Sequence, residues 1–415
     1  MRAAAEPAEE YGCRHKTRKD LRAGFFCTQS KDRGMQRSDE APWWIRKQGE
    51  LLEIAGQHLN AYVYDLETVR ARAEAILALE SVSRVLYAVK ANFNGDILRV
   101  LADSGVDFDC VSPGEVEQVR SAVGEASDGR ILFTPNFAPR DEYEWGIRAG
   151  VRVTLDNLYP LEAWPEIFRG QRLFIRVDPG QGRGHHAHVR TAGDGSKFGV
   201  ALSEIERLAE LVAAADATVI GIHAHSGSGI LEVENWHTVA EALQKAAAYF
   251  PDVEVLDLGG GFGVPVKRGD AAFDLSKLDE LLSQFRTQHD RYDLWLEPGR
   301  YLVSEAGVLL CHVTQLKRKG EEHYVGVSTG INALIRPALY DAWHEIVNLS
   351  RVHEPPARPV SVVGPLCESG DRFAAGRSLP ECREGDVILI ANAGAYGQVM
   401  SSRYNLRDVP PEIAI

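Results

Sequence analysis

Strand-like and helix-like segments alternate between about residues 83 and 300, and this alternation limits the possible folds more than any other feature. Amphipathic stretches, with apolar residues at three- and four-residue spacing, separate most of the strand-like runs. Eight such units predict a (β/α)8 barrel, because their span is close to the roughly 250 residues that such barrels use. A doubly wound open sheet is the alternative, since a strand count alone does not separate the two. The expected strands are Arg84–Val89, Val106–Val111, Ile131–Thr134, Val151–Leu155, Leu173–Val177, Val219–His225, Val253–Leu258 and Leu294–Glu297.

The segments on either side of this barrel have different patterns. Residues 1–42 carry mixed charge without a sustained hydrophobic period, which predicts a disordered tail. Residues 43–65 end in the strand-like run Leu59–Asp65, which we expect to join the sheet of a second domain. The barrel itself is expected over residues 66–300. Residues 301–415 hold several strand-like runs with few long helical stretches, so they predict a β-rich C-terminal domain.

The composition is that of a globular enzyme. Of the 415 residues, 45% are hydrophobic and 25% are charged, which supports a large core. The formal net charge of −13 argues against nucleic acid as a partner, and no apolar run is long enough to span a bilayer. The six cysteines form no CxxC pair and follow no apolar signal segment, so a reduced, cytoplasmic setting is expected.

A lysine closes the first apolar run of the barrel, VLYAVKAN (Val85–Asn92). Lys90 is costly at the end of a buried strand unless its amine has a role. Three later motifs also follow strands, namely HAHSGSG (His223–Gly229), LDLGGGFG (Leu256–Gly263) and LEPGR (Leu296–Arg300). Barrel active sites form at the carboxyl ends of the strands, so these segments are expected to converge. Together they indicate a pyridoxal phosphate (PLP) site in which Lys90 forms the Schiff base.

The glycine-rich segment suits the phosphate of such a cofactor. Gly259, Gly260 and Gly261 have no side chains, so their backbone N–H groups can approach an anion closely. The motif is neither a P-loop nor a dinucleotide-binding fingerprint, and a simple tight turn is the alternative. Arg300 and Ser228 would add a cation and a hydroxyl group to the phosphate.

Glu297 bears on the type of reaction. A carboxylate at the pyridine nitrogen keeps that nitrogen protonated, and the protonated ring stabilises the carbanion that is left when CO2 departs. An ordinary solvated loop glutamate is the other interpretation of Glu297. His225 is expected to stack on the ring, unless it is simply a hydrogen-bonded core histidine.

A zinc site is a competing interpretation of the histidines. Neither a cysteine nor a carboxylate stands at ligand spacing from them, so no metal is expected. The histidines concerned are His185, His186, His188, His223 and His225.

Cys367 lies in a polar, glycine-containing segment, GPLCESGD (Gly364–Asp371), of the expected C-terminal domain. A thiol at such a position can protonate a carbanion. The alternative is that Cys367 is a small buried hydrophobe, which is the commoner fate of a free cysteine.

Six motifs occur in a fixed order between about residue 45 and residue 415: YAVKAN, HAHSGSG, DLGGGFG, EPGR, CESGD and GAYGQVMSSRYN. This set resembles the PLP-dependent decarboxylases of the alanine-racemase fold (fold type III). The resemblance implies a PLP-binding barrel with a β-domain, in homodimers whose active sites lie at the interface. It also implies that Lys90 carries PLP, that His225 stacks on it and that Glu297 holds the pyridine nitrogen.

The same resemblance implies further contacts. Cys367 would be the proton donor, supplied by the partner subunit. The phosphate or its approach would be surrounded by Ser228, Gly261, Arg300 and Tyr396. The residues matching substrate-contacting positions of the family are Arg300, Arg336, Tyr340, Glu368 and Tyr396.

The spacing of the substrate residues favours one substrate. Arg336 and Tyr340 are four residues apart, so they share one face if this segment is helical. A guanidinium binds a carboxylate through two parallel hydrogen bonds, and Glu368 can take an ammonium group. The expected reaction is therefore decarboxylation of the amino-acid substrate meso-2,6-diaminopimelate to L-lysine and CO2. A surface salt bridge is the other interpretation of Arg336.

Three other functions stay open on the sequence. One is decarboxylation of another basic amino acid, namely ornithine, arginine, lysine or carboxynorspermidine. A second is amino-acid racemisation, although racemases of this fold tend to place an arginine rather than a carboxylate at the pyridine nitrogen. A third is an inactive binding or regulatory relative, against which intact Lys90 and Cys367 argue.

Overall fold

The structure is a computed structural model that describes residues 41–415 apart from 181–182, 185–192, 194 and 268. The predicted tail, residues 1–42, therefore lies outside the described residues except for its last two positions. No helix within the described part of the chain is long and apolar enough to cross a membrane.

Eight parallel strands form a closed barrel. They are hydrogen-bonded in the order β5-β4-β3-β2-β12-β11-β9-β6, and a further pairing of β5 with β6 closes the ring. The barrel prediction is therefore confirmed and the open sheet is wrong, while the predicted strand ends differ by a residue or two. The strands are β2 (Arg84–Ala88), β3 (Asp107–Cys110), β4 (Ile131–Phe133), β5 (Arg152–Leu155), β6 (Arg172–Asp178), β9 (Thr218–His223), β11 (Val255–Asp257) and β12 (Asp293–Leu296).

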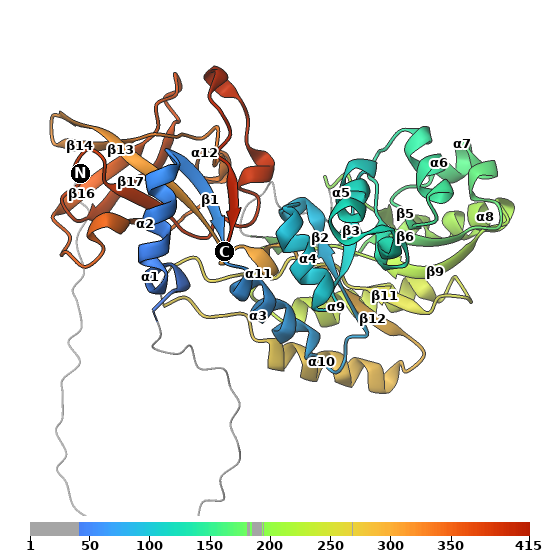
Figure 1. The fold of residues 1–415 in the computed structure, drawn as a ribbon. Coiled ribbons are helices and arrows are strands. Elements are labelled where there is room, and N and C mark those ends of the chain that lie inside the picture. Colours follow the sequence, from blue (N-terminus) through green and yellow to red (C-terminus); the bar gives the residue numbers. More distant parts are fainter. Residues whose placement is uncertain (1–40, 181–182, 185–192, 194, 268) are drawn as a thin grey trace, which may run out of the picture. The chain divides into compact units, whose positions relative to one another are not determined.

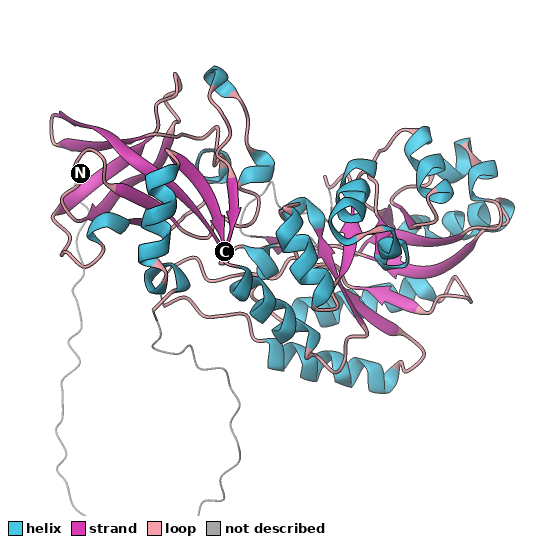
Figure 2. Cartoon of the chain, viewed as in Figure 1, coloured by secondary structure: helices cyan, strands magenta, loops and turns pink. Residues whose placement is uncertain are grey.

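Helices follow the strands and pack around them (Figures 1 and 2). Several of these helices begin at N-cap side chains that can be recognised from the sequence. Ser112 Oγ accepts a hydrogen bond from the N–H of Glu115 at 3.2 Å, and the carboxylate of Glu115 accepts one from the N–H of Val111 at 2.8 Å. The helices of this region are α3 (Leu66–Leu77), α4 (Gly95–Asp103), α5 (Pro113–Val123), α6 (Arg140–Arg148), α7 (Tyr159–Ala163), α8 (Ile205–Ala214), α9 (Glu234–Ala247), α10 (Leu275–Gln288) and α11 (Arg300–Val303).

Large apolar side chains fill the interior of the barrel. A buried cluster takes one residue from each of five barrel strands: Leu86, Leu132, Phe174, Val255 and Trp295. The Phe174 and Trp295 rings lie 5.2 Å apart, centre to centre. This packing closes the barrel below the carboxyl ends of its strands, so polar residues there face one open end.

A β-rich sheet forms the second part of the fold. Its main order is β15-β18-β13-β14-β16-β17, and β1, from the segment before the barrel, pairs with β13 and with β19. Buried residues of α1 and α2 pack on this sheet, among them Trp43, Leu51 and Ala55. The elements are α1 (Trp43–Arg46), α2 (Gln48–Gln57), β1 (Asn60–Tyr64), β13 (Gly307–Lys319), β14 (Glu322–Val327), α12 (Arg336–Tyr340), β15 (Ile346–Asn348), β16 (Arg358–Val363), β17 (Arg372–Leu379), β18 (Val387–Ile390) and β19 (Glu412–Ala414).

Two hydrogen bonds join the loop after β18 to the turn that carries Lys90. The backbone N–H of Tyr396 donates to the carbonyl of Ala91 at 2.8 Å. The side chain of Asn92 donates to the carbonyl of Gly394 at 2.9 Å. The C-terminal sheet therefore places one of its loops directly beside the open end of the barrel.

Candidate active site

A cavity of about 320 Å³ lies at the carboxyl ends of the barrel strands. Most of the site residues expected from the sequence line it: Lys90, His225, Ser228, Glu297, Arg300, Arg336, Tyr340 and Tyr396. The cavity is also lined by residues that were not predicted as site residues from the sequence: Asp109, Val111, Thr134, Asn136, Arg176, Phe198, His223 and Met400.

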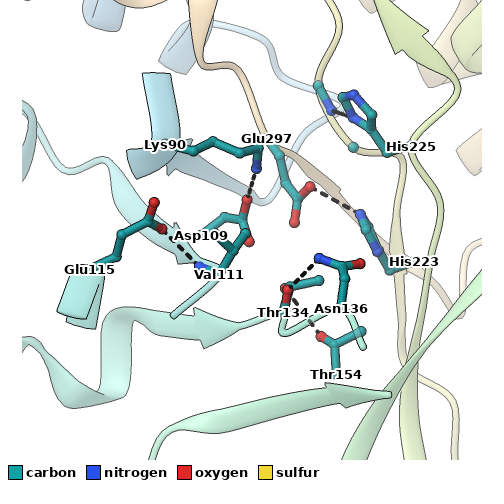
Figure 3. A network of polar contacts seen from close by, with 12 residues as sticks. Lys90, Asp109, Val111, Glu115, Thr134, Asn136, Thr154, His223, His225 and Glu297 are labelled. Atoms are coloured by element: carbon teal, nitrogen blue, oxygen red, sulfur yellow. Dashed lines mark hydrogen bonds and ion pairs between the residues drawn. The ribbon is translucent and has the colours of Figure 1, made fainter. Parts of the chain in front are cut away.

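Lys90 lies in a 3-10 turn, Val89–Ala91, immediately after β2 rather than within the strand. Its amine is 2.6 Å from Asp109 Oδ2, at the end of β3 (Figure 3). Burial alone would lower the pKa of Lys90, but Asp109 and Glu297 outweigh it and raise the pKa above 10.5. An amine attacks an aldehyde only when it is neutral, and Asp109 is placed to accept the proton.

Glu297 follows β12 and is 4% exposed. Its Oε2 lies 3.0 Å from His223 Nε2, while Oε1 has no hydrogen-bond partner among the described residues (Figure 3). Burial opposes ionisation of Glu297, but His223 and Lys90 outweigh it and lower the pKa to about 2. An ionised carboxylate oxygen is therefore available to an N–H donor in the cavity.

The three glycines pack behind the cavity wall and do not line it themselves. The N–H of Gly260 donates to His225 Nδ1 at 3.2 Å. A Cβ at Gly260 would lie 2.0 Å from the carbonyl oxygen of Glu297, and one at Gly261, where φ is +97°, 2.4 Å from that of Gly227. Both positions require glycine, since backbone approaches them too closely for a side chain.

His225 lies two residues beyond the end of β9 and is held as a neutral ring. Burial, Arg176 and Lys90 lower its pKa to about 3. Because Nδ1 accepts the N–H of Gly260, the ring proton belongs on Nε2. A neutral imidazole with a fixed tautomer suits the stacking role expected for it.

Arg300 begins α11 and points at a second group of polar residues. Its Nη2 donates to Ser228 Oγ at 3.0 Å, and its guanidinium carbon lies 4.9 Å from the centre of the Tyr396 ring. Nε of Arg300 is buried with no hydrogen-bond partner in the described part of the chain. Among the described residues no carboxylate pairs with Arg300, so this corner of the cavity suits an anion such as a phosphate.

Arg336 and Tyr340 are the first and last residues of α12, and both line the cavity. Arg336 is 7% exposed, and its Nη1 lies 3.4 Å from His344 Nε2. Burial and the nearby Arg300 lower the pKa of Arg336 to about 9. Within the described chain no carboxylate forms an ion pair with Arg336, so a second anionic group can be bound here.

Cys367 and Glu368 do not line the cavity of their own chain. Both side chains are exposed, so the interpretation of Cys367 as a buried hydrophobe is wrong. The N–H of Cys367 donates to Asn405 Oδ1 at 2.8 Å, and Glu368 accepts the N–H of Gly370 at 3.1 Å. Their expected roles would need a second chain.

Of the five histidines of the zinc alternative, the structure describes His223 and His225. His223 contacts Glu297, and His225 accepts an N–H group from the glycine loop. The remaining three, His185, His186 and His188, lie outside the described residues.

The side chains around the cavity fit PLP. A lysine amine faces the cavity, an ionised carboxylate has an oxygen with no partner, and Arg300 with Ser228 forms a place for a phosphate. Two of these groups, Glu297 Oε1 and Arg300 Nε, are buried atoms with no hydrogen-bond partner within the described chain, which is unusual unless a ligand supplies one.

Known proteins with similar sequences and folds agree with this fit. Residues 66–304 match the family described as pyridoxal-dependent decarboxylase, pyridoxal binding domain. The chain is 39% identical over 344 residues to a diaminopimelate decarboxylase of Methanothermobacter thermautotrophicus, with 80% of each chain covered. It is 33% identical over 371 residues to that of Escherichia coli K12, covering 85% of this chain and 87% of that one.

Solved structures give the same result. A crystal structure of diaminopimelate decarboxylase matches with a TM-score of 0.82 at 31% identity, covering 89% of this chain and 91% of that one. The enzyme from Helicobacter pylori complexed with L-lysine matches with a TM-score of 0.81 at 29% identity, covering 88% and 94%.

Proposed function

The chain belongs to the pyridoxal-dependent decarboxylase family, and from this premise we infer that it is a PLP-dependent carboxy-lyase acting on meso-2,6-diaminopimelate. The products are L-lysine and CO2. Curated relatives from several organisms carry the name diaminopimelate decarboxylase, and one similar solved structure holds L-lysine. The observation that carries the substrate is Arg336, a buried cation without a carboxylate partner in the described chain, in the same cavity as Lys90.

PLP supplies the electron sink for the electron pair that stays on the substrate when CO2 departs. Lys90 would hold the cofactor through its amine, with Asp109 accepting the proton that the amine releases. The unpartnered oxygen of Glu297 would hold a proton at the pyridine nitrogen. His225 would support the ring from one face as a neutral imidazole.

The anionic groups would be bound by the cationic side of the cavity. Arg300 and Ser228 would take the phosphate, with Tyr396 beside them and the N–H group of Gly261 behind. The N–H groups of Gly259 and Gly260 already donate to Asp257 and His225. Arg336 and Tyr340 would take the far carboxylate of the substrate. Ornithine, lysine and arginine lack that carboxylate, so with them Arg336 would stay buried and unpaired, which is costly.

We further propose a homodimer in which Cys367 of one subunit reaches the cavity of the other. In support, Cys367 and Glu368 are exposed and lie outside their own cavity. The Cys367 thiol would deliver the proton that replaces CO2, and Glu368 would bind the far ammonium group. No role is proposed for nucleic acid, because the net charge is −13.

Product analysis with the purified protein and PLP tests the proposal. We expect meso-diaminopimelate to give lysine and CO2 in equal amounts, and Lys90→Ala protein to give neither. Ornithine, arginine, lysine and carboxynorspermidine are then supplied singly and in competition. Faster turnover of any of these would refute the substrate, and loss of chirality without loss of CO2 would indicate a racemase instead.

A further inference from the structure

Three buried acid–base side chains meet at the wall of the cavity, which His223 and Glu297 line and Asp257 does not, and the function proposed above uses only Glu297. His223 ends β9, Asp257 ends β11, and Glu297 follows β12. These strands are neighbours in the barrel, and Asp257 is the register partner of His223. One nitrogen or oxygen atom from each of the three side chains lies within 4.8 Å of the others, and all three residues are buried.

The hydrogen bonds within this group are incomplete. His223 Nε2 lies 3.0 Å from Glu297 Oε2, and Asp257 Oδ1 accepts the N–H of Gly259 at 3.0 Å. Three further atoms are buried with no partner among the described residues: His223 Nδ1, Asp257 Oδ2 and Glu297 Oε1. Of these, Glu297 Oε1 is the one that the pyridine nitrogen would meet.

Two carboxylates this close in a buried site cannot both ionise without a large cost, so one of them holds a proton. His223 donates to Glu297 and lowers its pKa, whereas burial and the charge of Glu297 raise the pKa of Asp257 well above 3.8. The other charged neighbours do not reverse this order. Lys90 and Arg176 favour ionised Glu297, and Asp109 opposes ionised Asp257.

We propose that His223 and Asp257 are positioning residues for Glu297. His223 donates its Nε2–H to Oε2, which fixes the carboxylate so that Oε1 faces the cofactor. Asp257 is a neutral carboxylic acid, which leaves Glu297 as the ionised member of the pair. This inference rests on the proposed function, because it requires the pyridine nitrogen to meet Glu297.

Matched substitutions separate the two roles. Glutamine places its amide nitrogen close to the position of a histidine Nε2, so His223→Gln keeps the donor while His223→Leu removes it. Asparagine is neutral and isosteric with a protonated aspartic acid, so Asp257→Asn should change little, while Asp257→Leu should be damaging. His353→Leu, at an exposed histidine outside the site, is the control.

The direct readout is the 15N resonance of the pyridine nitrogen in protein loaded with 15N-labelled PLP. Wild type, His353→Leu, His223→Gln and Asp257→Asn are expected to show a protonated nitrogen. His223→Leu is expected to move the resonance toward the unprotonated position. The kcat of His223→Leu protein should fall roughly 10- to 100-fold with KM little changed. This is the loss expected when a hydrogen bond to a charged group is removed.

The outcomes distinguish this inference from the proposed function. If wild type binds no PLP, or binds it with an unprotonated nitrogen, the proposed function fails. If wild type has a protonated nitrogen that His223→Leu leaves unchanged, only the role of His223 is refuted. If Asp257→Asn moves the resonance or lowers kcat as much as Asp257→Leu, Asp257 is not a neutral acid. Should the leucine variants not fold, a shifted resonance in His223→Gln or Asp257→Asn protein still refutes the inference, because each of these variants must behave as wild type.

Discussion

Replacing Arg336 by methionine tests how this chain would recognise diaminopimelate. Methionine keeps an unbranched side chain of similar reach in a position that is 7% exposed, but it removes the cation. A hydrogen bond to a charged group contributes about 1.5–3 kcal/mol, so two parallel bonds to the far carboxylate contribute about 3–6 kcal/mol. The cost of stripping water from a buried guanidinium offsets part of this. We therefore expect kcat/KM to fall roughly 10²- to 10³-fold, since each 1.36 kcal/mol is a factor of ten.

The loss should fall on KM. The far carboxylate does not change during the reaction, so its contact with Arg336 is equally strong before and during catalysis. Initial rates of CO2 release over a range of meso-diaminopimelate concentrations separate kcat from KM. The matched control is Arg207→Met, at an exposed arginine on α8 whose ion pairs within the described chain are with surface glutamates. A kcat/KM within about twofold of the control, or a loss confined to kcat, would refute the assignment of Arg336.

Three further predictions follow from the same geometry. Lys90→Ala protein should keep its far-ultraviolet circular dichroism but lose the visible absorption of bound PLP; retention of that absorption would exclude Lys90 as the attachment point. Cys367→Ala protein should keep the absorption and lose roughly 10²–10⁴-fold in kcat, and mixing it with Lys90→Ala protein should restore activity. Failure to restore activity after subunit exchange would contradict sites shared between subunits. In the cofactor-free protein, Glu297 has its pKa lowered from 4.5 to about 2, so its ionised form stabilises the fold above pH 4.5 and this contribution is lost as the pH falls toward 2. Urea unfolding of Glu297→Gln protein should therefore show a smaller loss of stability across that interval than wild type, and an equal or larger loss would show that Glu297 is not ionised in the fold.

The sequence predicted the barrel well because its strands are buried on both faces. Such strands are nearly continuous apolar runs, so a polar residue at their ends is conspicuous. Lys90, His225 and Glu297 are polar residues of this kind, and the structure places all three around one cavity. The same argument does not single out Asp109, the partner of Lys90, because its strand segment Val106–Val111 (VDFDCV) also contains Asp107 and is not a continuous apolar run.

Other parts of the site depend on contacts that no local pattern records. Asn136 lies in the loop after β4 and Arg176 lies in β6, and they meet only because the ring closes, with Arg176 Nη1 at 3.0 Å from Asn136 Oδ1. The sequence assigns His223 no role at the PLP site, because its contact with Glu297 joins residues 74 positions apart. Cys367 differs from these residues, because it meets no other site residue within its own chain. Its proposed role in the cavity of a second subunit requires that it be exposed in its own chain.

The attachment of PLP to Lys90 is the central claim, and borohydride reduction followed by peptide mass spectrometry tests it most directly. Reduction of the PLP-loaded protein should fix the cofactor on the peptide that contains Lys90 and on no other. A label on a different lysine, such as Lys197 or Lys267, or no reducible label at all, would contradict the account.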